Sequence, residues 1–436
     1  MAQAQTSAST ISLESEIAAL FAKSRASLPG PTWLQTARAE ALSRVMRDGL
    51  PHRRIEAWKY TDFRNKLASG LDLAQGKATG ARSLFDGLKA HRIDINGGMV
   101  ARAPTAEDLP DGLEILSLAE ASAMPSLWLR QLLKPNDTTL DNLNLAFARD
   151  GALIRVGQAT RVADPIFLCH RLSESGAAAH TRSVIALEEG AELTLIEIDD
   201  GTPASQSFAN TVTAISLEPG ARLRHIRVTA SGAQSLVVRN DTIEIARDAT
   251  YEGVILSSAA AMARQQLQAR MTGPGGSFDL ACAYAAGEAQ HTDYTIEVVH
   301  EAPNTRSRIL SKGIASGTGH AVVQGRVIVR SEAQKTDSHQ LSRALLLSPH
   351  AEIDQKPELE IFADDVKCGH GAAIGALDLN QLFYLRARGI PEREARNMLV
   401  AAFLGEVTER IPSGDWRERI EAWLGERMAH ITGDAA

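Results

Sequence analysis

The chain has 436 residues, of which 44% are hydrophobic and 5% aromatic, and its formal net charge is −7. This length allows two or three domains or one elongated domain. The acidic balance, without a long basic run, argues against a nucleic-acid-binding protein, and no apolar run reaches the ~18 residues of a membrane span.

Residues 1–10 lack the basic and apolar regions of a signal peptide, and we expect them to be disordered. Residues 11–149 are predicted to form an N-terminal helical and mixed region. Ser12 can cap a first helix, and a second helix is expected between Pro31 and Pro51, because apolar residues recur there at helical spacing.

Between residues 150 and 375, short alternating runs separated by turn residues replace the helical periodicity. A pattern of a turn residue, Ala, a polar residue and an apolar residue begins at Gly190 and returns at Gly220, Asp248 and His350. Short strands with recurring turns are typical of β-solenoids, sandwiches and large barrels, and a repeat of about 28–30 residues favours the solenoid.

Residues 376–436 return to helical patterns. Asp378 can cap a helix that ends before Gly389, Pro391 is expected in the first turn of the next helix, and a third helix contains Trp416. Such a helical hairpin either packs on its own domain or docks a partner, and both interpretations stay open. The predicted architecture is therefore mainly β, with helical regions on both sides of the β core.

The segment around Cys368 is the most informative for chemistry. Alternating residues before it predict a strand, in which Cys368 and His370 face the same side. A thiolate and an imidazole suit iron, zinc or copper(I), but a structural zinc or an iron–sulfur cluster normally has four ligands. The pair therefore predicts half of a metal site whose other ligands come from elsewhere, such as another subunit. The alternative is a buried thiol beside a hydrogen-bonded histidine.

The other cysteines are interpreted as core residues. Cys169 and His170 are adjacent on a predicted strand and point to opposite faces, so they cannot share a ligand. Cys282 lies in a run of small residues. Three widely separated cysteines form no disulfide framework and are typical of a reducing cytoplasm. His291 and Asp293 are interpreted as ordinary surface polar positions.

Motifs of common enzyme classes are missing from the sequence. It contains no G-x-S-x-G, no H-E-x-x-H and no phosphate-binding glycine loop followed by Lys and Ser or Thr. We therefore expect a non-catalytic protein that does not bind nucleotide by itself. A carbohydrate-active β-solenoid enzyme is the alternative from another class, but clustered carboxylates on successive coils are missing.

Three C-terminal segments closely resemble the SufB/SufD family of iron–sulfur cluster assembly proteins. They are residues 342–348, 357–372 with the run Asp-Asp-Val-Lys-Cys-Gly-His-Gly-Ala, and 383–390. That run resembles the SufD branch in particular, as does Trp-Lys-Tyr-Thr at residues 58–61. The SufB branch carries more cysteines and an acidic residue where this chain has Gly371, and a SufB-type scaffold is the alternative within the family.

The resemblance implies a right-handed parallel β-helix that pairs with the β-helix of a SufB-like subunit. It implies that an iron–sulfur cluster forms transiently at this interface, with His370 as a ligand and Cys368 beside it, while the chain alone holds no cofactor stably. It also makes a flavin a candidate ligand of the complex and a homodimer a candidate form of the isolated chain.

The resemblance further implies that the C-terminal helices, at residues 383–407, dock a SufC-like ATPase. The candidate anchors are Leu382, Phe383, Met398 and Phe403, of which those that face solvent are expected to contact the ATPase. Because ATPase activity belongs to that partner, this chain is expected to be a non-catalytic assembly subunit in the cytoplasm.

Overall fold

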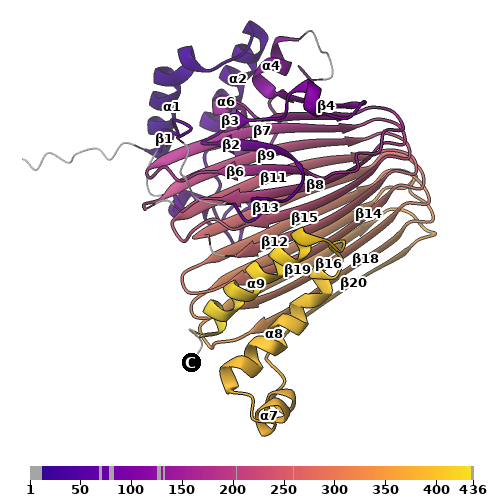
Figure 1. Ribbon diagram of the computed structural model, residues 1–436. Coiled ribbons are helices and arrows are strands. Elements are labelled where there is room, and N and C mark those ends of the chain that lie inside the picture. The colour runs from indigo at the N-terminus through magenta and orange to yellow at the C-terminus, as the bar shows by residue number, and fades with distance from the viewer. Residues whose placement is uncertain are drawn as a thin grey trace, which may run out of the picture.

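The structure is a computed structural model that describes residues 12–433, except for 68–70, 78–82, 125–128, 131–132, 203 and 259. The segment 1–10, predicted to be disordered, lies outside the described residues. The described chain is mainly β, with a parallel β-solenoid of about 8 turns between N-terminal and C-terminal helices (Figure 1). The predicted parallel β-helix is confirmed.

Two 10-stranded sheets, called sheet A and sheet B below, form the opposite walls of the solenoid. From β5 onward the strands alternate between the sheets, so each coil adds one strand to each sheet, parallel to the coil before it. Sheet A contains β4 (Leu113–Ser117), β5 (Ala152–Val156), β7 (Ala177–Leu187), β9 (Ser207–Leu217), β11 (Ser235–Ile245), β13 (Met262–Met271), β15 (His291–His300), β17 (His320–Val329) and β19 (Glu352–Ile361), with β1 (Asp72–Leu73) paired to β7. Sheet B contains β3 (Met99–Arg102), β2 (His91–Asn96), β6 (Ile166–Arg171), β8 (Glu192–Asp200), β10 (Arg222–Thr229), β12 (Thr250–Ser258), β14 (Ser277–Ala286), β16 (Arg306–Ala315), β18 (Asp337–Leu346) and β20 (Lys367–Gly375).

Successive coils stack in register. Leu236 of β11 pairs with Met262 of β13, and His320 of β17 pairs with Glu352 of β19, so the coil-to-coil spacing varies from 26 to 32 residues. Stacking lets a strand form backbone hydrogen bonds on both sides, which satisfies its buried polar groups. β19 and β20 end their sheets, and within the described residues no strand pairs with their outer edges.

The first three copies of the sequence repeat mark one corner of the coils. Their turn residues Gly190, Gly220 and Asp248 have φ values of 69°, 71° and 57°, a conformation that glycine adopts without steric cost. The apolar residues three positions later pair with one another on β8, β10 and β12. The fourth copy, at His350, was wrongly assigned to this repeat, because it precedes β19 in sheet A, and similar short turns occur at corners of both sheets.

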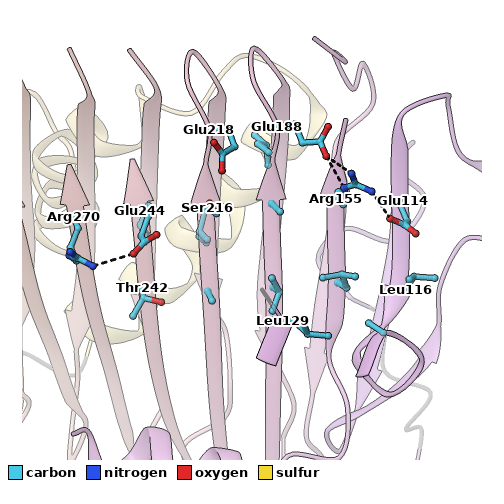
Figure 2. A pocket seen from close by; sticks show the side chains of 18 of the residues that line it. Glu114, Leu116, Leu129, Arg155, Glu188, Ser216, Glu218, Thr242, Glu244 and Arg270 are labelled. Carbon is cyan, nitrogen blue, oxygen red and sulfur yellow. Dashed lines mark hydrogen bonds and ion pairs between the residues drawn. The ribbon is translucent and has the colours of Figure 1, made fainter. Parts of the chain in front are cut away.

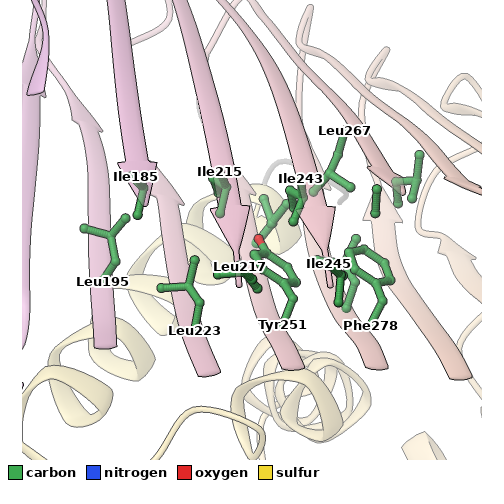
Figure 3. Packing of buried hydrophobic residues seen from close by; sticks show 14 of the residues in the cluster. Ile185, Leu195, Ile215, Leu217, Leu223, Ile243, Ile245, Tyr251, Leu267 and Phe278 are labelled. Carbon is green, nitrogen blue, oxygen red and sulfur yellow. The ribbon is translucent and has the colours of Figure 1, made fainter. Parts of the chain in front are cut away.

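Apolar side chains fill the space between the sheets. Ile185, Ile215 and Ile243 of sheet A lie in one cluster with Leu195 and Leu223 of sheet B (Figure 3). Burial of apolar surface stabilises a fold by about 25 cal/mol per Å². Because each coil covers the next, this core continues along the solenoid.

Helices cover the outer faces of the sheets (Figure 1). The N-terminal helices pack on sheet A against Phe208 and Leu236, and the C-terminal α8 and α9 pack on sheet B against Ile226 and Leu256. None of the described helices is both long and apolar enough to cross a lipid bilayer. The helices are α1 (Leu13–Ser24), η1 (Arg25–Ser27), α2 (Thr32–Asp48), η2 (Glu56–Trp58), α3 (Phe63–Lys66), η3 (Ala106–Asp108), α4 (Leu118–Ala123), α6 (Thr139–Phe147), α7 (Leu379–Ala387), α8 (Glu392–Thr408) and α9 (Asp415–Gly433).

Two predicted helix caps are present. The Ser12 hydroxyl accepts a hydrogen bond from the backbone N–H of Ser15 at 3.2 Å, and the Asp378 carboxylate accepts one from Asn380 at 2.8 Å. These bonds satisfy backbone donors that have no partner within the helix. Pro391 is the N-cap residue of α8 rather than a residue of its first turn.

Candidate functional site

Cys368 and His370 lie on β20, the last strand of sheet B. Cys368 is in register with Ser338 of β18, and His370 is in register with Gln340. Ser338 and Gln340 are buried, and Cys368 contacts the apolar cluster between the sheets. In-register residues of neighbouring strands point to the same face, so both side chains are directed toward the interior side of the last coil.

The last coil leaves this pair accessible, because no further coil covers it. His370 is exposed and Cys368 is half-buried, although equivalent positions on β18 are buried. Gly369 faces the opposite side, where an added Cβ would lie 3.5 Å from the His339 ring. The predicted same-face arrangement of thiol and imidazole thus sits at the open end of the solenoid.

The Cys368 thiol is held protonated in its resting state. Partial burial raises the pKa of Cys368, and a backbone hydrogen bond from Ser338 opposes this effect. Only a thiolate binds metal, so binding at Cys368 must release a proton. Within the described ranges, no third His, Cys, Asp or Glu joins Cys368 and His370 at metal-binding distance. The register thus places the two side chains on one face of β20, and the half-site that the spacing predicted stays a prediction.

Cys169 and Cys282 are buried, which confirms their interpretation as core residues. Burial raises the pKa of Cys169 to about 11 and also raises that of Cys282, so both thiols stay protonated at neutral pH. His170 is buried as well. Neither thiol is placed to bind a metal with a partner subunit.

The interpretation of His291 and Asp293 as surface residues was wrong. Both are buried beneath the N-terminal segment, where Asp293 forms an ion pair with Arg264 and accepts a hydrogen bond from Thr61. The Arg264 guanidinium also lies 3.8 Å from the centre of the Trp58 ring. The Trp-Lys-Tyr-Thr segment therefore fastens the N-terminal region to sheet A, a contact between residues more than 200 positions apart.

A buried ionic network inside the solenoid was missed by sequence reasoning. Arg239 binds Asp199 at 2.6 Å and also pairs with Glu197, which lies 3.2 Å from Arg227. All four side chains are buried. The only signal in the sequence is that Glu197 and Arg227 occupy the same position of successive coils, where they pair in register.

The four candidate docking residues separate into two groups. Phe383 and Met398 are 72% and 45% exposed, whereas Leu382 is buried. Phe403 packs against the sheet B cluster, and the Lys312 ammonium lies 4.8 Å from the centre of its ring. Leu382 and Phe403 therefore belong to the chain's own packing, and Phe383 and Met398 are available to a partner.

Two further exposed apolar residues on α7 were not predicted. Leu379 is 74% exposed and Tyr384 is 56% exposed. They extend the exposed apolar surface to which Phe383 belongs. α7 lies at the N-terminal end of α8 and projects away from the solenoid (Figure 1). The sequence analysis did not single them out, because the apolar residues of α7 do not gather on one face of the helix.

A cavity of about 950 Å³ lies on the outer face of sheet A. Figure 2 shows its ion pairs, in which Arg155 bridges Glu114 and Glu188 and Arg270 binds Glu244 at 3.2 Å. Among the described residues that line it there is no histidine or cysteine. This cavity thus offers no soft or imidazole ligand and is separate from the Cys368 edge.

The chain folds as a parallel β-solenoid with helical flanks, and the family models that match it describe iron–sulfur cluster assembly proteins. The family described as "SUF system FeS cluster assembly, SufBD core domain" matches residues 170–403, and the SufBD protein N-terminal region matches residues 11–168. The chain therefore belongs to the SufB/SufD family of iron–sulfur cluster assembly proteins.

Relatives of the chain cover nearly its whole length. It is 28% identical to the iron–sulfur cluster assembly protein SufD of Escherichia coli, over 89% of this chain and 91% of SufD. It is 30% identical to a SufBD family protein of Synechocystis, over 85% and 86% of the two chains. It is 28% identical to the chloroplastic protein ABCI7 of Arabidopsis thaliana, over 92% and 86%. The resemblance to SufD seen in the sequence is confirmed.

Proposed function

We propose that this chain is a non-catalytic, SufD-like subunit of a cytoplasmic iron–sulfur assembly complex. It pairs with a SufB-like subunit through its last coil and contributes His370 to a nascent cluster. The observation that carries this proposal is the exposed imidazole and the half-buried thiol on the terminal strand β20, whose outer edge has no partner strand among the described residues.

The edge of the last coil is suited to another chain. Strands at a sheet edge present unpaired N–H and C=O groups, which form a template for an added strand. Ile361, Phe362 and Ile374, at the ends of β19 and β20, are also exposed. Exposed apolar groups next to an open sheet edge are typical of a protein–protein interface.

The half-site explains why a partner is required. A cluster normally takes four protein ligands, and Cys368 and His370 supply at most two. The SufB-like subunit is expected to provide the others. His370 is the stronger candidate, since its side chain is exposed whereas the thiol must lose a proton first.

The surface of α7 and α8 is proposed to dock a SufC-like ATPase. Of the eight large apolar residues exposed in the described chain, Leu379, Phe383, Tyr384 and Met398 lie on these two helices. Apolar helical anchors bind by entering a complementary groove. Energy from ATP hydrolysis would then reach the β-solenoid through α8, which packs on sheet B.

The cluster role is tested by His370→Ala in the complex reconstituted with SufB-like and SufC-like partners. We expect iron and sulfide content to fall severalfold while the subunits still co-purify, because one ligand is missing. His339→Ala is the matched control, since His339 is also exposed on the neighbouring strand but faces the other side. Unchanged iron content in the His370→Ala complex would contradict the proposal.

The docking role is tested separately with Phe383→Asp and Met398→Asp. A charge on a buried anchor is costly to desolvate, so both variants should lose the ATPase and keep the SufB-like subunit. Met124→Asp is the control, because Met124 is 52% exposed but lies in the N-terminal region. If both variants still bind the ATPase, the docking surface lies elsewhere.

A further inference from the structure

A second group of metal-binding side chains lies on sheet A, apart from the Cys368 edge. His320 at the start of β17 and Glu352 and Asp354 on β19 each offer one donor atom, and these atoms all lie within 4.8 Å of one another. We propose that these three residues bind one divalent transition-metal ion of the Fe²⁺, Mn²⁺ or Zn²⁺ class.

The strand register brings the donors together. His320 pairs directly with Glu352, and parallel strands lie about 4.8 Å apart. Asp354 is two positions after Glu352 and shares its face, and its carboxylate lies 2.8 Å from His320 Nε2. Ile353, between them, faces the interior cluster instead. Three donors therefore converge on the outer face, although the two carboxylates lie 32 and 34 residues after His320 in the chain.

The donor distances fit a single ion. Zinc binds imidazole nitrogen and carboxylate oxygen at about 2.0–2.2 Å, so two ligands of one ion lie about 3–4 Å apart. The donor atoms lie within 4.8 Å of one another, and Glu352 is exposed, so its side chain is free to rotate toward a bound ion. Among the described residues, no Lys or Arg forms an ion pair with Glu352 that would compete for its carboxylate.

The ligand types select the metal class. One imidazole and two carboxylates suit Fe²⁺, Mn²⁺ and Zn²⁺, and the absence of a thiolate disfavours copper(I). Three protein ligands leave coordination positions open. The site therefore lacks the four protein ligands that are typical of a structural zinc ion.

A cavity adjoins the group on the side of His320, and Glu352 and Asp354 are not among the residues that line it. It measures about 570 Å³ and is lined by His320, the buried His291, Tyr60 and the cations Arg53 and Lys66. The rings of His291 and His320 lie 4.7 Å apart, and His291 Nε2 lies 2.8 Å from Thr61 Oγ1. The hydrogen bond to Thr61 therefore holds the His291 ring against the His320 ring. Arg53 and Lys66 favour a small anion, or water, in this cavity next to His320.

The test is a titration of the purified full-length chain with Zn²⁺ in competition with a chromophoric chelator. We expect one site, whose affinity falls at least about tenfold in His320→Ala and in Glu352→Gln. Glu352 is exposed, so Glu352→Gln tests the ligand without disturbing the fold. Thermal unfolding of the metal-free variants checks that both are folded.

The control is His339→Ala, which removes a histidine that also lies near a carboxylate, with Asp337 at 3.2 Å, but outside any three-donor group. It should bind Zn²⁺ as the unmodified chain does. Cys368→Ala with His370→Ala should also retain the site, which separates this proposal from the cluster role. Equal affinity in Glu352→Gln, His320→Ala and the unmodified chain would overturn the proposal and leave an ordinary His–Asp pair.

Discussion

The middle coils and the last coil hold similar side chains in opposite environments. On β6, Cys169 and His170 are buried, with the neighbouring strands β2 and β8 on either side. On β20, Cys368 is half-buried and His370 is exposed, because β18 pairs with one edge only. The same two residue types are thus structural in one coil and accessible in the other.

This difference shows that position in the stack decides what a reactive side chain can do. A middle strand is covered by strands on both edges and often by helices on its outer face. The last coil packs on the preceding coil with one edge and leaves its other edge open. A solenoid therefore offers its interior-facing residues to a partner only at its ends.

The largest expected effect is in the interior. Arg239→Met leaves Glu197 and Asp199 without their shared cation, and breaking a buried ion pair costs about 3–5 kcal/mol. Urea unfolding measures this loss. The matched control near the open end is Arg326→Met, whose exposed ion pair with Glu360 should contribute under about 1 kcal/mol. Equal losses in both variants would break the comparison.

The pH dependence of stability should also come from the covered coils. Burial lowers the pKa of His180 to about 3 and that of His300 to about 4, whereas an unfolded histidine has a pKa near 6.5. Below about pH 6.5 the unfolded chain binds protons that the folded chain excludes. The free energy of unfolding should therefore fall toward pH 4, by about 1.4 kcal/mol per pH unit for each such histidine. Urea unfolding at pH 7, 6 and 5 measures the slope, and constant stability over this range contradicts the prediction.

Thiol labelling compares the coils directly. Cys368 should react with a maleimide at least about tenfold faster than Cys169 and Cys282, because the latter are buried and their thiols are held protonated. Mass spectrometry of peptides at increasing labelling times gives the three rates. Similar rates under native conditions would show that the middle coils open as readily as the end.

The smallest expected effect is on the stability of His370→Ala. Substitution of an exposed residue such as His370 usually changes the free energy of unfolding by no more than about 0.5 kcal/mol. Thermal unfolding of the isolated chain measures it. A loss of about 1–3 kcal/mol would instead indicate a hydrogen-bonded structural histidine, and the reduced cluster content would then follow from misfolding.

Local rules made the general architecture predictable. Left-handed turn residues such as Gly190 and Gly220 recur because each coil needs a sharp corner, so the repeat indicated a solenoid. Alternation along a strand is also local, so Cys368 and His370 could be placed on one face before any tertiary contact was known. Helix caps such as Asp378 depend on residues a few positions away.

Register and burial were decided by tertiary contacts. Which of Leu382, Phe383, Met398 and Phe403 face solvent depends on how α7 packs on α8 and how α8 packs on sheet B, which no local pattern specifies.

The sequence by itself determined the period of the coils and the face shared by Cys368 and His370, because both follow from backbone geometry over a few residues. Only the tertiary structure decided that His291 is buried, that Glu197 meets Arg227, and that His320 meets Glu352. Those contacts join residues about 30 or more positions apart, and their register depends on the length of every intervening turn.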